Sequence, residues 1–239
     1  MTGVQTCAVF FVNQDDTAAY ASNSLLKLDD AGFNLTARGV ADNGLRYGAA
    51  IKFNTDASGG GVSVDERALW FEGGWGRLEL GNDDDASSGM TNHGGDLNSG
   101  AGGYDGGPSA AFDFQGVEQA GPGIAGGGDA TKVTYFTPRI NGIQVGVSYT
   151  PDTGADGDDS LSDVVGDTDD VQDHIGLGIN FVQSFDDVGI AVAYVLSYGD
   201  PELNTTRDVK SWSIGGKVDF GNISVAAGYG DARDRKSVV

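Results

Sequence analysis

The feature that most constrains this chain is a two-residue periodicity in segments about as long as a membrane-crossing strand. Between residues 188 and 198 the even-numbered positions are large and apolar, whereas the odd-numbered positions are mostly glycine, alanine or serine. Successive side chains of a β-strand point to opposite faces, so this segment predicts one apolar face and one face of small residues. A tilted strand of roughly 9–11 residues crosses a bilayer, and this segment has that length.

The same periodicity recurs along the chain, in segments joined alternately by tight turns and by long glycine-rich or acidic connections. Strands are expected at about residues 9–12, 33–38, 45–53, 68–72, 77–81, 132–138, 143–149, 175–181, 188–198, 212–220 and 223–229. Residues 13–30 are expected to be a long connection with a short extended piece at Leu25–Leu28, and residues 56–66 a second connection. Alternating short and long connections are typical of transmembrane barrels. The sequence therefore predicts an all-β, antiparallel transmembrane β-barrel with about eleven strands present.

Composition argues against several other classes of protein. The formal net charge of −21 disfavours a nucleic-acid partner, because phosphate contacts need clustered Lys and Arg. The sequence has no run of about 18 apolar residues, which a transmembrane helix requires. Cys7 is the one cysteine, and His93 and His174 are far apart, so a disulfide, a zinc site or a catalytic triad is not indicated. We expect no catalytic residue, no metal centre and no enzyme activity.

Much of the acidity lies in loop-like segments, at residues 83–85, 156–159 and 167–173. Such segments are usually solvated, and the alternative is weak Ca²⁺ or Mg²⁺ binding through carboxylate oxygens. None has the spacing of an EF-hand, so no cofactor is expected beyond such loosely bound Ca²⁺.

Three stretches carry a resemblance to a known family. They are Ala41-Asp42-Asn43-Gly44-Leu45 leading into Tyr47-Gly48, Arg67 to Gly81, and Val133 to Pro138 with Asn141-Gly142 and Val147-Ser148-Tyr149. In order and spacing they resemble the Gram-negative general porins, particularly those of alphaproteobacteria, over roughly residues 9–230. The resemblance implies an outer-membrane, homotrimeric barrel of about sixteen strands, embedded in lipid, through which small hydrophilic solutes and ions diffuse passively.

In that family the third long loop folds into the lumen and narrows it. Residues 82–130, almost fifty residues without strand periodicity, fall where the resemblance places this loop. The chain departs from the family in lacking the final strands and the acidic Pro-Glu-Phe-Gly motif, and Met1–Gln5 does not begin a signal peptide. We therefore expect a single porin domain over residues 1–239, incomplete at its C-terminus, with both ends non-native.

Strand parity predicts which charges face the lumen. If Leu35, Tyr47, Ile51 and Leu80 face lipid, the side chains on the other face include a basic wall of Arg38, Arg46, Lys52 and Arg77. A Lys or Arg facing lipid at mid-bilayer would cost about 2–4 kcal/mol. The long loop would supply the opposing acids of the pore constriction, for which the candidates are Asp96, Asp105, Asp113 and Glu118. Opposed charges create a transverse field that acts on dipolar and charged solutes. The alternative is that each basic residue is solvated or paired with a neighbour such as Glu79.

Aromatic residues share the expected lipid face, as they do in the interfacial girdles of barrels. These residues are Tyr47, Phe53, Tyr135, Tyr149, Tyr194, Tyr198, Trp212 and Tyr229. The alternative is a soluble extracellular β-sandwich that binds carbohydrate or calcium through its acidic loops and buries these aromatics against a second sheet. A barrel would instead leave the apolar face exposed to lipid and keep the small and polar residues inside.

Overall fold

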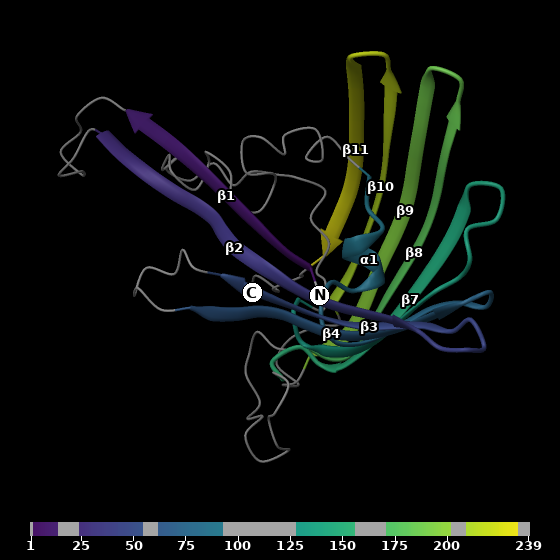
Figure 1. Ribbon diagram of the computed structural model, residues 1–239. Helices are drawn as coiled ribbons and strands as arrows, with labels where there is room; N and C mark the ends of the chain where they lie inside the picture. Colours follow the sequence, from purple (N-terminus) through teal and green to yellow (C-terminus); the bar gives the residue numbers. More distant parts are fainter. Residues whose placement is uncertain are drawn as a thin grey trace, which may run out of the picture.

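The structure is a computed structural model, and it describes residues 2–13, 24–54, 62–92, 128–155, 171–201 and 209–233. Eleven strands form one antiparallel sheet whose order follows the chain from β1 to β11 (Figure 1). The strands are β1 (Thr2–Asn13), β2 (Ser24–Val40), β3 (Arg46–Asn54), β4 (Ser63–Gly73), β5 (Gly76–Asn82), β6 (Thr131–Phe136), β7 (Ile143–Asp152), β8 (Val171–Phe185), β9 (Val188–Pro201), β10 (Val209–Phe220) and β11 (Ile223–Arg233). One helical turn, α1 (Ala86–Gly89), follows β5.

The sheet is strongly curved, and α1 lies on its concave side against β6, β7, β8 and β9 (Figure 1). Within the described ranges β1 pairs with β2 alone and β11 with β10 alone, so these two strands are the edges of an open sheet. Short turns join strands at one end of the sheet. In the turn before β7, Asn141 and Gly142 have φ values of 51° and 88°, the left-handed conformation that this residue pair adopts readily.

The two faces of the sheet differ as the periodicity predicted. On β9, Ala193 and Val195 are buried on the concave face, with 2% and 1% of their surface exposed, whereas Tyr194 is 40% exposed on the convex face. Buried polar side chains, including Thr134, Ser148, Thr150, His174, Ser197, Ser211 and Ser213, also gather on the concave face. The convex face is therefore apolar and exposed, and the interior side is small and polar.

The predicted aromatic face lies on the convex side. Tyr47, Tyr149, Tyr194, Tyr198 and Tyr229 are exposed there. Trp212 lies between two of them, with its ring 6.2 Å from that of Tyr194 and 5.8 Å from that of Tyr229.

Three strand predictions are wrong in their limits, and β-bulges explain why. Residues 24–40 form one strand rather than a long connection with a short extended piece, and β1 runs from Thr2 to Asn13 rather than over four residues. The pairing of these strands shifts register between Thr6 and Ala8. A second shift beside Lys52 lets β4 begin at Ser63, within the predicted connection. A bulge inserts an extra residue, so the two-residue period is interrupted although the strand continues.

Candidate functional site

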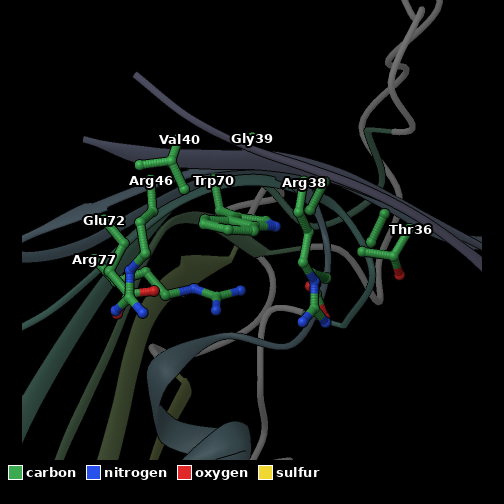
Figure 2. A pocket seen from close by; sticks show the side chains of 11 residues that line it. Thr36, Arg38, Gly39, Val40, Arg46, Trp70, Glu72 and Arg77 are labelled. Atoms are coloured by element: carbon green, nitrogen blue, oxygen red, sulfur yellow. The ribbon is translucent and has the colours of Figure 1, made fainter. Parts of the chain in front are cut away.

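Three of the four predicted basic residues line one cavity on the concave face. The cavity has a volume of about 400 Å³, and Arg38 on β2, Arg46 on β3 and Arg77 on β5 border it. Sheet register explains the grouping, because Arg46 pairs with Glu72, and Glu72 pairs with Arg77 on the following strand. Figure 2 shows the three guanidinium side chains extending from the strands to the same side, with Trp70 between Arg38 and Arg46.

Two of these guanidinium groups have carboxylate partners on the same wall. Arg46 forms an ion pair with Glu72, and the Nε atom of Arg77 forms one with Glu79. The guanidinium carbon of Arg77 also lies 4.9 Å from the centre of the Trp70 ring, within the range of a cation–π contact. The pairing with Glu79 is the alternative that the sequence had left open for Arg77.

Lys52 shares the face but not the cavity. Its Nζ atom lies 2.6 Å from a carboxylate oxygen of Asp65 and 3.0 Å from one of Glu66, where the bulge in β4 brings two acidic residues together. Lys52 lines a smaller neighbouring cavity instead. The carboxylates of Asp65 and Glu66 therefore balance the positive charge of Lys52, which strand parity had assigned to the basic wall.

The predicted loop acids Asp96, Asp105, Asp113 and Glu118 lie outside the described residues. A carboxylate that the prediction had not selected, that of Asp83, lines the same cavity as the three arginines. Asp83 directly follows β5, the strand that carries Arg77, and this position in the sequence could have indicated that its carboxylate lies near the arginines. Trp70 was also missed, although its parity with Ala68 and Glu72 indicates the concave face.

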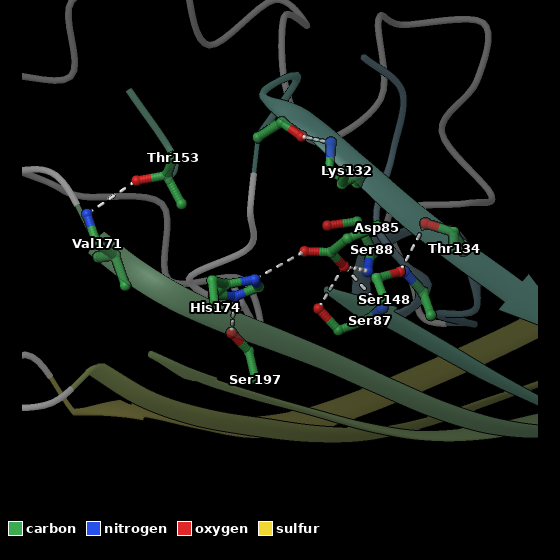
Figure 3. Close-up of polar contacts among 12 residues, drawn as sticks. Asp85, Ser87, Ser88, Lys132, Thr134, Ser148, Thr153, Val171, His174 and Ser197 are labelled. Atoms are coloured by element: carbon green, nitrogen blue, oxygen red, sulfur yellow. Dashed lines mark hydrogen bonds and ion pairs between the residues drawn. The ribbon is translucent and has the colours of Figure 1, made fainter. Parts of the chain in front are cut away.

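The segment after Asp83 is attached to the concave wall by polar contacts (Figure 3). The Asp85 carboxylate caps α1 by accepting hydrogen bonds from the backbone N–H groups of Ser87 and Ser88, at 2.7 Å and 2.9 Å. The backbone N–H of Ala86 donates to the hydroxyl of Ser148 on β7 at 2.6 Å.

A second attachment is made to β8. The Nδ1 atom of His174 lies 3.8 Å from the second oxygen of Asp85, and its Nε2 atom is 2.5 Å from the hydroxyl oxygen of Ser197 on β9 (Figure 3). Asp85, His174 and Ser197 are all buried. The start of the long loop thus contacts β7 through Ser148 and β8 through His174, which in turn contacts Ser197 on β9.

Three glycines on the wall leave the room that α1 occupies. A Cβ atom on Gly178 would lie 2.8 Å from the carbonyl oxygen of Ala86 and 2.9 Å from the Cβ atom of Met90. Gly176 faces Asp85 in the same way, and Gly146 faces the Met90 sulfur. Met90, Ala86 and Val195 form a small buried apolar cluster above these glycines.

Lys132 on β6 holds the two ends of the long loop together. Its buried Nζ atom donates to the carbonyl oxygens of Asp83 and Gly128, the latter at 2.7 Å. Acidic residues surround this point. Loss of hydration together with the nearby charges of Asp83 and Asp129 raises the pKa of Asp84 above its usual range.

Metal ligation finds no support among the residues that the structure describes. They contain no group of three His, Cys, Asp or Glu side chains that could hold a metal ion. Residues 156–159 and most of 167–173 lie outside the described ranges, so loosely bound Ca²⁺ in those segments stays a prediction. No described helix has the length and apolar character needed to span a membrane.

Comparison with known proteins gives a consistent result. A family model described as Gram-negative porin matches residues 1–238. An uncharacterized protein of Rickettsia bellii (strain RML369-C) is 22% identical in an alignment 233 positions long that covers 71% of this chain and 53% of that protein. The chain thus spans about half the length of this curated relative.

Two solved structures illustrate the likeness in three dimensions. A porin structure refined at 1.8 Å resolution is similar with a TM-score of 0.54 and 17% identity, over 96% of this chain and 66% of that one. A mutant of the Rh. blastica porin is similar with a TM-score of 0.49 and 17% identity, over 98% of this chain and 83% of that one. The first of these supports the porin fold.

Proposed function

The chain belongs to the Gram-negative porin family of the bacterial outer membrane, and from this premise we propose that it forms a water-filled channel for passive diffusion of small hydrophilic solutes and ions. The family and the fold are those of a channel rather than an enzyme. The proposal extends to a homotrimer embedded in outer-membrane lipid, as the sequence resemblance implies.

The observation that carries this proposal is the polarity of the two faces. Many large apolar side chains on the convex face are exposed, among them Tyr194 at 40% and Tyr229 at 68%, whereas buried Ser, Thr and His side chains line the concave face. A soluble sheet would cover its apolar face, but a barrel leaves that face to lipid. Among the described residues there is one sheet, so the soluble sandwich left open by the sequence lacks the second layer that it needs.

We further propose that residues 82–130 form the constriction loop and that Arg38, Arg46, Lys52 and Arg77 form the basic wall opposite its acids. Support comes from α1 on the concave side and from Asp83, which borders the cavity of the three arginines. Asp96, Asp105, Asp113 and Glu118 remain the candidate acids farther along the loop. The ion pairs of Lys52 reduce its expected share in selectivity.

Conductance across a planar lipid bilayer tests the channel. The refolded protein should insert in discrete current steps, and the reversal potential in a KCl gradient should report selectivity. Arg38→Gln should shift selectivity toward K⁺ and Glu72→Gln toward Cl⁻, because each removes one charge of opposite sign from the same cavity. Asp187→Asn, in the exposed turn between β8 and β9, should leave the reversal potential unchanged.

Absence of current steps from protein that shows a heat-sensitive, folded band on a gel would refute the channel. Shifts in the same direction for both substitutions would refute the basic wall. Chemical cross-linking in detergent tests the trimer separately, since a ladder that ends at two copies would contradict it.

A further inference from the structure

We infer that the cavity bordered by Arg38, Trp70 and Arg77 is a binding subsite for small monoanionic carboxylates that carry a short apolar stem. This inference rests on the proposed function, because such a solute reaches the concave face through the pore. It adds to that function a preferred class of solute and a defined site where the solute binds transiently.

Arg38 supplies the anion-binding group. Arg46 and Arg77 have carboxylate partners on the wall, whereas Arg38 has no hydrogen bond or ion pair with any residue that the structure describes. Among the described residues, no acceptor therefore takes up its planar set of donors. A carboxylate matches this set with two parallel hydrogen bonds, which a chloride ion cannot make.

The cavity also offers apolar surface, of which Trp70 lies between Arg38 and Arg46 and Val40 lies on the Arg46 side. Its lining includes Val40, Ala50 and Ala68 as well as Trp70 (Figure 2). Val40 pairs with Arg46 across the β2–β3 ladder and is 68% exposed, so its methyl groups are accessible. A short carbon stem placed here would lose water-exposed apolar surface on binding.

Trp70 makes the floor of the cavity rigid. A Cβ atom at Gly48 would lie 2.5 Å from the Trp70 ring, so this glycine allows the ring to lie directly on β3. The Arg77 guanidinium group lies near the ring centre, at 4.9 Å. Only 9% of Trp70 is exposed, so its indole is a fixed support whose emission would respond to a charge bound nearby.

Size and charge narrow the class of solute. A volume of about 400 Å³ is near the lower end of small-molecule sites, which suits a solute of a few carbon atoms. Asp83 also borders the cavity, so a second negative charge on the solute would meet a carboxylate. One available guanidinium group and one facing acid together favour monoanions over dianions.

Tryptophan fluorescence tests this subsite directly. In a Trp75→Phe, Trp212→Phe background, Trp70 is the only tryptophan, and the detergent-folded protein is titrated with sodium butyrate, butyramide and sodium succinate at constant ionic strength. Butyrate should change the emission saturably, while butyramide, which lacks the charge, should not. Succinate should bind more weakly than butyrate because it carries two charges.

Substitutions identify the groups responsible. Arg38→Gln should weaken butyrate binding by about tenfold or more, the loss expected for a charge-assisted hydrogen bond. Lys217→Gln removes a cation from the concave face of β10, outside the cavity, and should leave the titration unchanged. An unchanged titration in Arg38→Gln, or an equal response to butyramide, would overturn the proposal.

The unsubstituted protein provides a second measurement in case the tryptophan variants do not fold. Butyrate added to KCl should reduce the channel current with a saturable dependence on concentration, and butyramide should not. A conducting channel without saturable block refutes the subsite alone. Saturable fluorescence titration without any conductance refutes the channel while the subsite stands.

Discussion

The Asp85 carboxylate lies 3.8 Å from the Nδ1 atom of His174, and both side chains are buried where α1 meets the sheet. The same carboxylate accepts hydrogen bonds from the backbone of Ser87 and Ser88 at the start of α1. One side chain therefore begins the helical turn and also attaches it to β8. A substitution at Asp85 would therefore affect both the helical turn and its attachment.

Asp85→Ala is expected to destabilise the folded protein by about 1–2 kcal/mol through loss of the helix cap, with a further loss at His174. The temperature at which the folded band converts on a gel should fall, and the open-channel current should become noisier as the loop moves. Ser88→Ala is the matched control, because Ser88 contributes its backbone N–H to the cap. Equal transition temperatures for Asp85→Ala and the unsubstituted protein would contradict this attachment.

Gly178→Ala is expected to displace α1, because the added methyl group would lie 2.8 Å from the backbone oxygen of Ala86. Overpacking of this kind typically costs about 1–3 kcal/mol. Gly189→Ala is the control on β9, where the nearest atoms are 3.4 Å away and belong to the Asp219 side chain. Thermal denaturation in detergent compares the two variants, and equal losses would show that the glycine does not accommodate α1.

The raised pKa of Asp84 predicts a dependence of stability on pH. Asp84 is exposed, but partial loss of hydration and the neighbouring acids favour its protonated form in the folded state. Stability therefore falls as the pH rises through the folded-state pKa and is regained at lower pH. Asp84→Asn should therefore raise the transition temperature at pH 7, and this gain should disappear below about pH 4, where the carboxyl is protonated in both states. Asp187→Asn in the exposed turn is the control. A gain that persists at pH 3 would contradict this assignment.

Two tryptophans should report the two faces of the sheet. Trp212 packs between Tyr194 and Tyr229 on the convex face, whereas Trp70 lies on the concave face. In vesicles of lipids with bromine-labelled acyl chains, a protein that retains only Trp212 should be strongly quenched, and one that retains only Trp70 should not. Equal quenching of the two would contradict the assignment of the convex face to lipid.

The regular strands were predictable from the sequence because side-chain alternation is a local property of extended backbone. Strand β9 and the part of β8 from Ile175 to Asn180 carry this alternation, and their faces are as predicted. The limits of β1, β2 and β4 were not predictable, because register shifts beside Thr6 and Lys52 interrupt the alternation. A bulge depends on how two strands align, which is not visible in either strand alone.

The candidate site, too, was predictable in its strand faces but not in its contacts between residues far apart in the sequence. Parity indicated that Arg38, Arg46 and Arg77 share a face, and the structure places them around one cavity. Parity could not indicate that Asp65 and Glu66 would pair with Lys52, or that Asp83 would border the arginine cavity. Those contacts depend on which residues the strand register and the returning loop bring within a few ångströms of each other.

By itself, the sequence determined the strand content, the apolar and polar faces of the sheet and the family to which the chain belongs. These properties can be predicted from short-range patterns, because alternation, tight turns and motif spacing depend on residues that are close together in the sequence. Tertiary structure decided which arginines have carboxylate partners among the described residues, and how α1 docks. Gly146 and Ser148 on β7 and His174, Gly176 and Gly178 on β8 accommodate α1 only when these two strands lie side by side. The helical turn α1 comes from a segment more than fifty residues earlier than Ser148.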